Sequence, residues 1–223
     1  YQDGLRDGQL VVVSRDLETA HYATGIAHRL QQALDDWNFI APQLQDLYTT
    51  LNHGKARHGF AFGPRQCMAP LPRAFQLACG SAYLDHLQLL RGAELPASLR
   101  TDPLIHQGAS DDLLGPCDPV VVPSEAMGID FGAGLAVVTG DVPLGADADQ
   151  ALAGVRLLML ANDVSLRNLI PNELAKGFGF FQSKPATAFS PVAVTPEELG
   201  DAWQGGRVHL TLQSTWNGRK VGM

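Results

Sequence analysis

The sequence is poor in cysteine, has fewer basic than acidic residues and lacks any long apolar run. Its three cysteines, Cys67, Cys79 and Cys117, are odd in number and show no CxxC spacing. We therefore expect reduced thiols, as in a cytoplasmic protein, and neither a disulfide framework nor a thiolate zinc site. No apolar run reaches the length of a membrane span, and no signal peptide is visible at Tyr1.

Charge and size narrow the function classes further. Lysine and arginine number 16 against 23 acidic residues, which gives a net charge of −7. This balance argues against nucleic acids and anionic membranes as partners, because both need a basic face. The chain has 223 residues, of which 45% are hydrophobic, enough for one sizeable core with a small appendage.

The first third of the chain predicts a small α/β unit without catalytic residues. Residues 10–13 and 19–23 predict two strands that form a hairpin. Between residues 26 and 51 the apolar positions recur every three or four residues, which predicts two amphipathic helices that meet at Pro42. Prolines punctuate residues 63–72, so we place a linker there and divide the chain into residues 1–69 and 70–223.

The rest of the chain predicts mostly strands. Residues 120–122, 129–138 and 207–212 are expected strands, residues 197–202 a short helix, and Asn217-Gly218 the turn of a hairpin. Within 129–138, alternation places Asp130, Gly132 and Gly134 on one face. The fold class predicted is α+β, mainly β.

Candidate catalytic and ligand-binding residues follow the apolar run of residues 157–161. This apolar run is too short for a typical helix and does not alternate, so it predicts a strand buried on both faces, ending near Asp163. Arg167 and Lys184 follow, so one potential metal ligand and two cations for an anionic substrate lie in one region. The alternative is that Asp163 caps a helix and that both cations lie on its solvated face.

Three short motifs and one lysine resemble, in the family's chain order, signatures of the fumarylacetoacetate hydrolase family. Residues 162–167 (NDVSLR) are similar to NDVSxRD, residues 83–86 (YLDH) to NYxxH, and residues 115–120 (GPCDPV) to a GPxDPI turn; Lys184 falls at the family's substrate-binding lysine. The resemblance implies a mixed β-barrel or β-roll catalytic domain behind a small N-terminal α/β cap, in a cytoplasmic homodimer. It also implies that the family's domain continues beyond residue 223.

The resemblance further implies an enzyme of aromatic amino acid catabolism that hydrolyses a carbon–carbon bond in a β-diketone or acylpyruvate-type 2-oxo acid. A divalent Mg²⁺, or Mn²⁺ or Ca²⁺, bound by Asp163 would chelate the enolised dicarbonyl. His86 would deprotonate water, while Lys184 and Arg167 would stabilise the developing negative charge. Tyr83 and Gln182 are further candidates for substrate binding. For His86 and Gln182 the alternatives are a structural histidine and an ordinary loop amide.

The sequence departs from the family's motifs mainly in lacking acidic residues. Gly132 and Gly134 stand where the family has two metal-binding glutamates, and no acid closely follows His86, although Glu94 is not far along the chain. Three explanations stay open: Asp130 substitutes as a ligand, the pocket binds an anion without metal, or the glycines are alterations of an acidic parent. The corresponding alternative function is a metal-free protein that binds a small dicarboxylate or 2-oxo acid without turnover.

Overall fold

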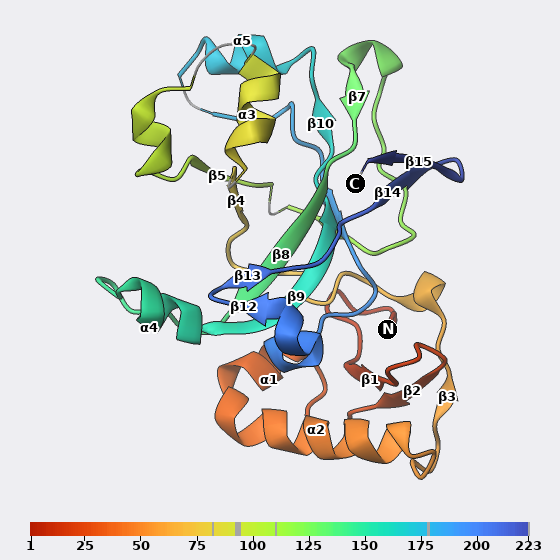
Figure 1. Cartoon of the computed structure of the whole chain (residues 1–223). Coiled ribbons are helices and arrows are strands. Elements are labelled where there is room, and N and C mark those ends of the chain that lie inside the picture. The colour runs from red at the N-terminus through yellow and green to blue at the C-terminus, as the bar shows by residue number, and fades with distance from the viewer. Residues whose placement is uncertain (82, 92–94, 110, 178, 223) are drawn as a thin grey trace.

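The computed structural model describes residues 1–81, 83–91, 95–109, 111–177 and 179–222. Figure 1 shows a lower part built from the N-terminal strands and helices, a long central strand pair, and an upper part that carries further short helices. The predicted α+β class, with more strand than helix, is confirmed. No helix in the described ranges is both long and apolar enough to cross a membrane.

The N-terminal part forms a three-stranded antiparallel sheet covered by two helices. Its strands are β1 (Val11–Val13), β2 (Thr19–Tyr22) and β3 (Phe60–Ala61), paired in that order, and its helices are α1 (Leu30–Asp35) and α2 (Trp37–Asn52). The β1–β2 hairpin confirms the sequence prediction. Apolar side chains from the hairpin and both helices are buried: Ala20, Ala23, Ala33 and Leu51.

We had predicted that the two helices meet at Pro42, but the break between them lies at Asp36. Asp36 adopts non-helical angles (φ −134°, ψ 51°), whereas Pro42 lies inside α2. A proline in a helix removes one backbone donor and crowds the preceding turn, which kinks or breaks many helices. Here the helix continues through it, and the chain turns instead at the residue before Trp37.

A four-stranded mixed sheet forms the centre of the second part, in the order β6–β11–β9–β8. Its strands are β6 (Leu113–Leu114), β8 (Ala133–Thr139), β9 (Val155–Asn162) and β11 (Thr187–Phe189). The pair of β6 and β11 is parallel, and the other pairs are antiparallel. On the inner face, Ala136, Met159 and Ala161 pack against a buried cluster of Ala69, Leu113 and Phe189. This face leads to Asp163, two residues after Ala161.

The prediction that residues 157–161 are buried on both faces is wrong for Leu160. Leu158 is 2% exposed, but Leu160 is 52% exposed, and its cross-strand neighbour Leu135 is 45% exposed. Alternate side chains of a strand share a face, so Leu158 and Leu160 lie on the same face, which is covered at Leu158, where the strand also pairs with Val194, and open at Leu160. The continuous apolar run therefore did not indicate burial along the whole strand.

This difference predicts unequal effects of two leucine truncations in one strand. Leu158→Ala removes a side chain that is 2% exposed, so it is expected to lower the free energy of unfolding by about 2–4 kcal/mol. Leu160→Ala, the matched control at 52% exposure, should cost less than about 1 kcal/mol. Urea unfolding of both variants measures the two values, and equal losses would contradict the difference in burial between the two side chains.

Shorter elements complete the second part. The remaining strands are β4 (Ala78–Gly80), β5 (Ile105–Gln107), β7 (Ile129–Asp130), β10 (Ser165–Leu166), β12 (Trp203–Gln204), β13 (Arg207–Val208), β14 (Ser214–Trp216) and β15 (Arg219–Gly222). The remaining helices are α3 (Leu84–Arg91), α4 (Ala148–Ala153) and α5 (Ile170–Leu174), with 3₁₀ turns η1 (Pro64–Gln66), η2 (Ala97–Arg100), η3 (Glu125–Met127) and η4 (Pro196–Ala202).

Several strand predictions need correction. Residues 120–122 form no strand, the predicted strand 129–138 is divided into β7 and β8 at residues 131–132, and only Arg207–Val208 of residues 207–212 is paired. The predicted hairpin turn is confirmed, with Asn217 at φ 49° and Gly218 at φ 76°. Two successive positive φ angles suit the twist of a tight hairpin, which is why Asn-Gly was a reliable signal.

Candidate active site

Lys184 and Asp163 meet in the second part, as the sequence predicted. Lys184 Nζ donates hydrogen bonds to Asp163 Oδ2 and to Ser165 Oγ, each at 2.8 Å. The Lys184 side chain is 12% exposed and that of Asp163 is 32% exposed. A largely desolvated ammonium group with a carboxylate beside it is the centre of the candidate site.

Two neighbouring strand ends place these residues. Asp163 follows the last residue of β9, and its N–H donates to the Gly132 carbonyl at 2.8 Å. Ser165 lies in β10, which pairs with β7, and it is buried. Because side chains alternate along a strand, Asp163 and Ser165 can both face Lys184.

A buried carboxylate holds the loop that carries Lys184. Glu173 in α5 accepts hydrogen bonds from the backbone N–H groups of Phe181, Gln182 and Ser183, and from the Ser183 hydroxyl. Burial by itself would raise the pKa of Glu173, but these hydrogen bonds lower it to about 2. The carboxylate is therefore ionised at neutral pH and fixes the residues directly before Lys184.

Arg167 and Asp130 are bound to each other. Arg167 Nε donates a hydrogen bond to Asp130 Oδ2 at 2.8 Å, and Nη2 forms an ion pair with the same oxygen at 2.8 Å. The two side chains are 37% and 47% exposed, so the pair adds little stability. In this arrangement the Arg167 guanidinium does not contact Lys184 or Asp163, and the Asp130 carboxylate is already matched by a cation.

Three other predicted site residues lie apart from this centre. Tyr83 precedes α3 and His86 is within it; both are exposed, and no hydrogen bond or ion pair between described residues joins them to Asp163 or Lys184. The backbone N–H of Gln182 donates to Glu173, and its side chain is exposed. Glu94, which entered the sequence argument, lies outside the described residues.

The sequence analysis missed two side chains on the neighbouring hairpin. Cys79 in β4 and His106 in β5 are cross-strand partners. Burial raises the pKa of Cys79, and the charge of Asp163 raises it further, while Lys184 opposes the change. Burial lowers the pKa of His106, and the charge of Lys184 lowers it further. Nothing in spacing marked these residues, because they join the site only through the packing of distant strands.

The residues present do not fit the divalent cation that the family resemblance implies. Hard cations bind through several oxygen ligands, but Gly132 and Gly134 supply no side-chain oxygen. Asp163 Oδ2 is bonded to Lys184, and Asp130 is bonded to Arg167. In the described ranges, no three histidine, cysteine or acidic side chains gather as a metal site would require.

The two glycines differ in the room they leave for a restored glutamate. A Cβ at Gly134 would meet nothing within 4 Å, whereas a Cβ at Gly132 would lie 2.7 Å from the Asp163 carbonyl oxygen. Gly134→Glu is therefore expected to change the unfolding free energy by less than about 1 kcal/mol, and Gly132→Glu to cost about 1–3 kcal/mol through a forced backbone shift.

Thermal unfolding with and without Mn²⁺ tests this difference. Gly134→Glu places a second carboxylate on the face of Asp163, so Mn²⁺ should raise its midpoint more than that of the unchanged chain. Gly25→Glu, at another glycine with open space around it, is the control for charge alone. Equal stability of the two variants at positions 132 and 134 would contradict the packing described.

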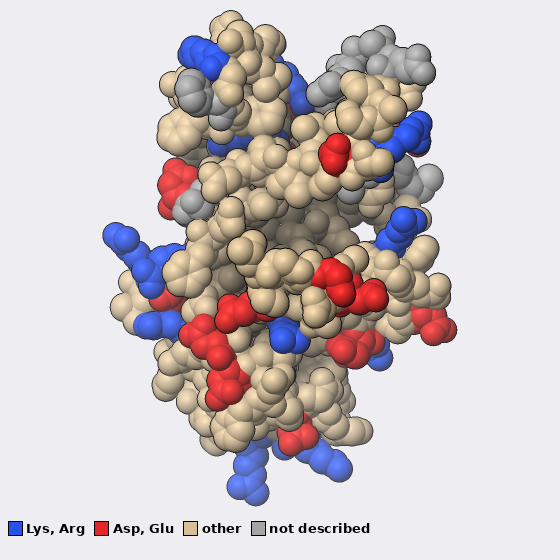
Figure 2. All heavy atoms as spheres, turned by 90° about the vertical axis from the view of Figure 1, so that its left-hand side faces the viewer, with Lys and Arg blue, Asp and Glu red and all other residues tan. Residues whose placement is uncertain are grey.

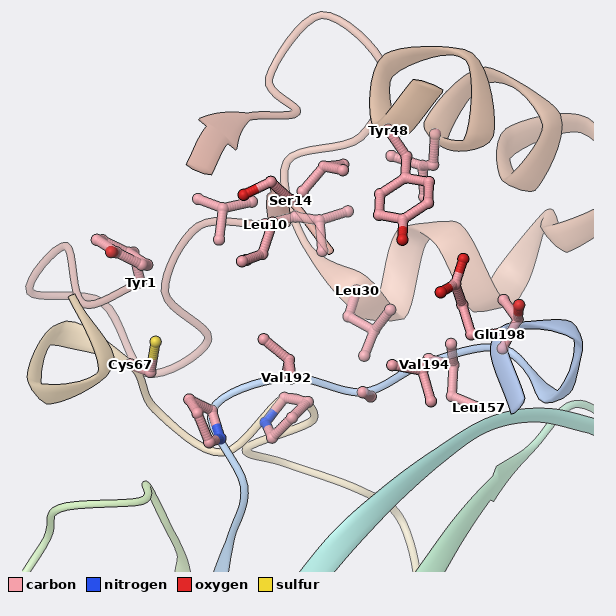
Figure 3. Close-up of a pocket in the computed structure, with 18 of the residues that line it drawn as sticks. Tyr1, Leu10, Ser14, Leu30, Tyr48, Cys67, Leu157, Val192, Val194 and Glu198 are labelled. Carbon is pink, nitrogen blue, oxygen red and sulfur yellow. The ribbon is translucent and has the colours of Figure 1, made fainter. Parts of the chain in front are cut away.

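A cavity of about 280 Å³ lies elsewhere, between the N-terminal part and residues 191–198 (Figure 3). Most of its lining is apolar and includes Leu10, Leu30, Val192 and Val194. Asp7 and Glu198 also line it, with Glu198 near Leu157. Glu198 is paired with Arg15 at 3.3 Å. The cavity is lined by neither Asp163 nor Lys184, so the candidate active site rests on the side-chain cluster. Figure 2 shows a further recess in one face of the molecule, above a band of acidic side chains.

Comparison with known families covers nearly the whole chain. Residues 1–73 match the model of the fumarylacetoacetase N-terminal domain 2, and residues 76–222 match the model of the fumarylacetoacetate hydrolase C-terminal domain. The chain is 33% identical over 142 residues to 2,4-didehydro-3-deoxy-L-rhamnonate hydrolase of Sphingomonas sp. (strain SKA58), a match that covers 62% of this chain and 47% of the relative.

Other relatives agree in family and differ in reaction. Mitochondrial oxaloacetate tautomerase of Rattus norvegicus is 28% identical over 138 residues, which cover 60% of this chain and 42% of that protein. The chain thus matches less than half the length of these curated relatives. Among solved structures, one named for the HpcE protein of Mycobacterium smegmatis has a TM-score of 0.59 at 20% identity, covering 87% of this chain and 66% of the other. This likeness shows the fold alone.

Proposed function

Because the chain belongs to the fumarylacetoacetate hydrolase family, we propose that it is an enzyme that acts on a small 2-oxo acid or β-dicarbonyl anion through an enolate held by Lys184. The observation that carries this proposal is the pair of 2.8 Å contacts from Lys184 Nζ to Asp163 and Ser165. An ammonium group has three donors, so two contacts orient it and leave a third hydrogen for a substrate oxygen.

Enolate stabilisation is common to the reactions of the relatives. A tautomerase moves a proton between carbon and oxygen, and hydrolysis of an acylpyruvate breaks a carbon–carbon bond so that an enolate leaves. In both, negative charge develops on a carbonyl oxygen, where a fixed cation in a partly desolvated site lowers the barrier. Lys184, at 12% exposure, is such a cation.

Of these two reactions, keto–enol tautomerisation requires fewer catalytic groups in this site. Hydrolysis also needs an activated water, and the base that we expected for it, His86, is exposed on α3 without a described link to Lys184. Tautomerisation needs a proton carrier and a place for the oxyanion. Hydrolysis of a β-diketone or acylpyruvate remains the second reaction to assay.

One observation favours a second function, binding without turnover. Gly132 and Gly134 replace two acids of the family's pattern, and Asp163 is neutralised by Lys184. The local charge is then suited to a dicarboxylate or 2-oxo acid that lies against the ammonium group. A homodimer, by resemblance to the family, remains a proposal for either function.

Activity and binding assays on the same chain separate these functions. Oxaloacetate tautomerisation is followed by the absorbance of the enol, acylpyruvate cleavage by loss of the substrate absorbance, and oxalate binding by calorimetry, each with EDTA and with Mn²⁺. We expect oxalate binding and tautomerisation to persist in EDTA. Oxalate binding without either reaction would support the binding function, and absence of both binding and turnover would overturn both proposals.

A further inference from the structure

His106 carries a buried polar atom with no partner in the described part of the chain. Its Nε2 is buried and accepts or donates no hydrogen bond there. Most buried polar atoms in proteins are satisfied, so an exception calls for an explanation. One explanation is a ligand that supplies the partner.

Strand pairing directs this imidazole toward Asp163 and Lys184. In β5 the residues on either side of His106 are exposed, as are those on either side of its partner Cys79 in β4, so both side chains point inward. Leu77, two residues before Cys79, packs against the same core cluster as Ala161. Asp163 lies two residues beyond Ala161, and the charges of Asp163 and Lys184 act on His106.

The ring is also held in place from the other side. Phe180 meets the His106 ring edge to face, with centroids 4.7 Å apart and planes at 75°. Phe180 is in the loop that Glu173 anchors and that ends at Lys184. The same loop therefore fixes both the ammonium group and the wall behind the imidazole.

The surroundings favour a neutral imidazole. Burial lowers the pKa of His106, and the nearby Lys184 charge lowers it further against the opposing effect of Asp163. Cys79, the other titratable group facing it, has a raised pKa and stays a thiol at neutral pH. In the tautomer that carries its proton on Nδ1, His106 presents the lone pair of Nε2 as a base.

We propose that His106 is the catalytic residue that moves the proton between carbon and oxygen of a 2-oxo acid held by Lys184. The C3–H bond breaks as Nε2 takes the proton. The electron pair of that bond forms the C2–C3 double bond, and the π electron pair of the carbonyl group moves to the oxygen beside Lys184. The imidazolium then returns the proton to that oxygen, so that no oxidant or further reactant is needed. This assignment rests on the proposed function.

Two measurements test the role of His106, and the second of them, a titration of its ring, needs no turnover. Exchange of the C3 hydrogens of pyruvate in D₂O is followed by ¹H NMR, and the His106 ring is titrated by long-range ¹H–¹⁵N NMR with and without oxalate. His106→Gln and His106→Phe are the variants, and His209→Gln, at an exposed histidine of the second part, is the matched control. Oxalate binding by calorimetry reports on the proposed function separately.

We expect both His106 variants to slow exchange about 100-fold or more, in the range that general bases contribute, while the Kd for oxalate changes by less than about threefold. The unchanged chain should lose exchange as the pH falls through a midpoint below the ordinary histidine value, and oxalate should raise the pKa of His106. His209→Gln should behave as the unchanged chain.

Other outcomes overturn the assignment. Exchange that survives in both His106 variants, or is lost in His209→Gln, places the base elsewhere. Oxalate binding that leaves the His106 titration unchanged shows that the ring does not face the ligand. Failure of the unchanged chain both to bind oxalate and to catalyse exchange would overturn the proposed function itself, whereas oxalate binding and exchange that persist after His106 is replaced would overturn only the role of His106.

Discussion

Replacing Lys184 by methionine is expected to lower turnover of a 2-oxo acid by about 100-fold or more, and to weaken oxalate binding by at least about 10-fold. The variant keeps most of the side-chain volume but removes the donor to Asp163 and Ser165. It also leaves the Asp163 carboxylate without its cation, so an approaching anion meets negative charge. Stopped-flow assays and calorimetry measure the two losses.

Lys176→Met is the matched control for this prediction. Lys176 is exposed and lies after α5, so its replacement removes one positive charge from the same region without touching the site. Activity and oxalate affinity should stay within about twofold of the unchanged chain, because isolated surface charges contribute little. Equal losses in both variants would mean that net charge, and not the position of Lys184, governs binding.

Replacing Glu173 by alanine is expected to lower the free energy of unfolding by about 3–5 kcal/mol, because buried donors lose a charged acceptor. These donors are three backbone N–H groups, of Phe181, Gln182 and Ser183, and the Ser183 hydroxyl. The loop would also release Lys184, so oxalate binding should weaken in the folded variant. Urea unfolding measures the first effect, and Glu197→Ala, at an exposed acid, is its control.

The same carboxylate predicts how stability depends on pH. The pKa of Glu173 is lowered from 4.5 to about 2 in the folded chain. A group with a lowered pKa stabilises the fold above its unfolded value and loses that contribution as the pH falls toward the folded value. The unchanged chain should therefore lose stability between about pH 4.5 and 2, and Glu173→Gln should show a smaller loss over this interval. An equal pH dependence in both would contradict the role of Glu173.

The sequence predicted the centre of the site better than its surroundings. Asp163 and Lys184 were identified from a strand end and from family motifs, and the structure joins them at 2.8 Å. The mutual pairing of Arg167 and Asp130 was not foreseen, because a motif indicates residue types and not which of two partners a cation chooses. His106 was missed for a related reason, since alternation along β5 gives the face of its side chain but not the strand that packs against it.

Fold predictions failed where tertiary contacts, and not the local sequence pattern, determined the structure. Pro42 predicted a break, but α2 continues through it and the chain turns at Asp36. The apolar run of β9 predicted two buried faces along its whole length, but the face that is covered at Leu158 is open to solvent at Leu160. Hairpins were predicted well, as at Asn217-Gly218, because backbone conformation at a tight turn depends on its own residues.

A crystal structure of the chain with oxalate tests most directly whether Lys184 binds the enolate. Oxalate is a planar dianion of the shape and charge of a pyruvate enolate. The account predicts one oxalate oxygen within hydrogen-bond distance of Lys184 Nζ, with the contact to Ser165 retained and the His106 ring facing the ligand. Oxalate bound away from Lys184, with Lys184 Nζ contacting Asp163 and no oxalate oxygen, would contradict this account.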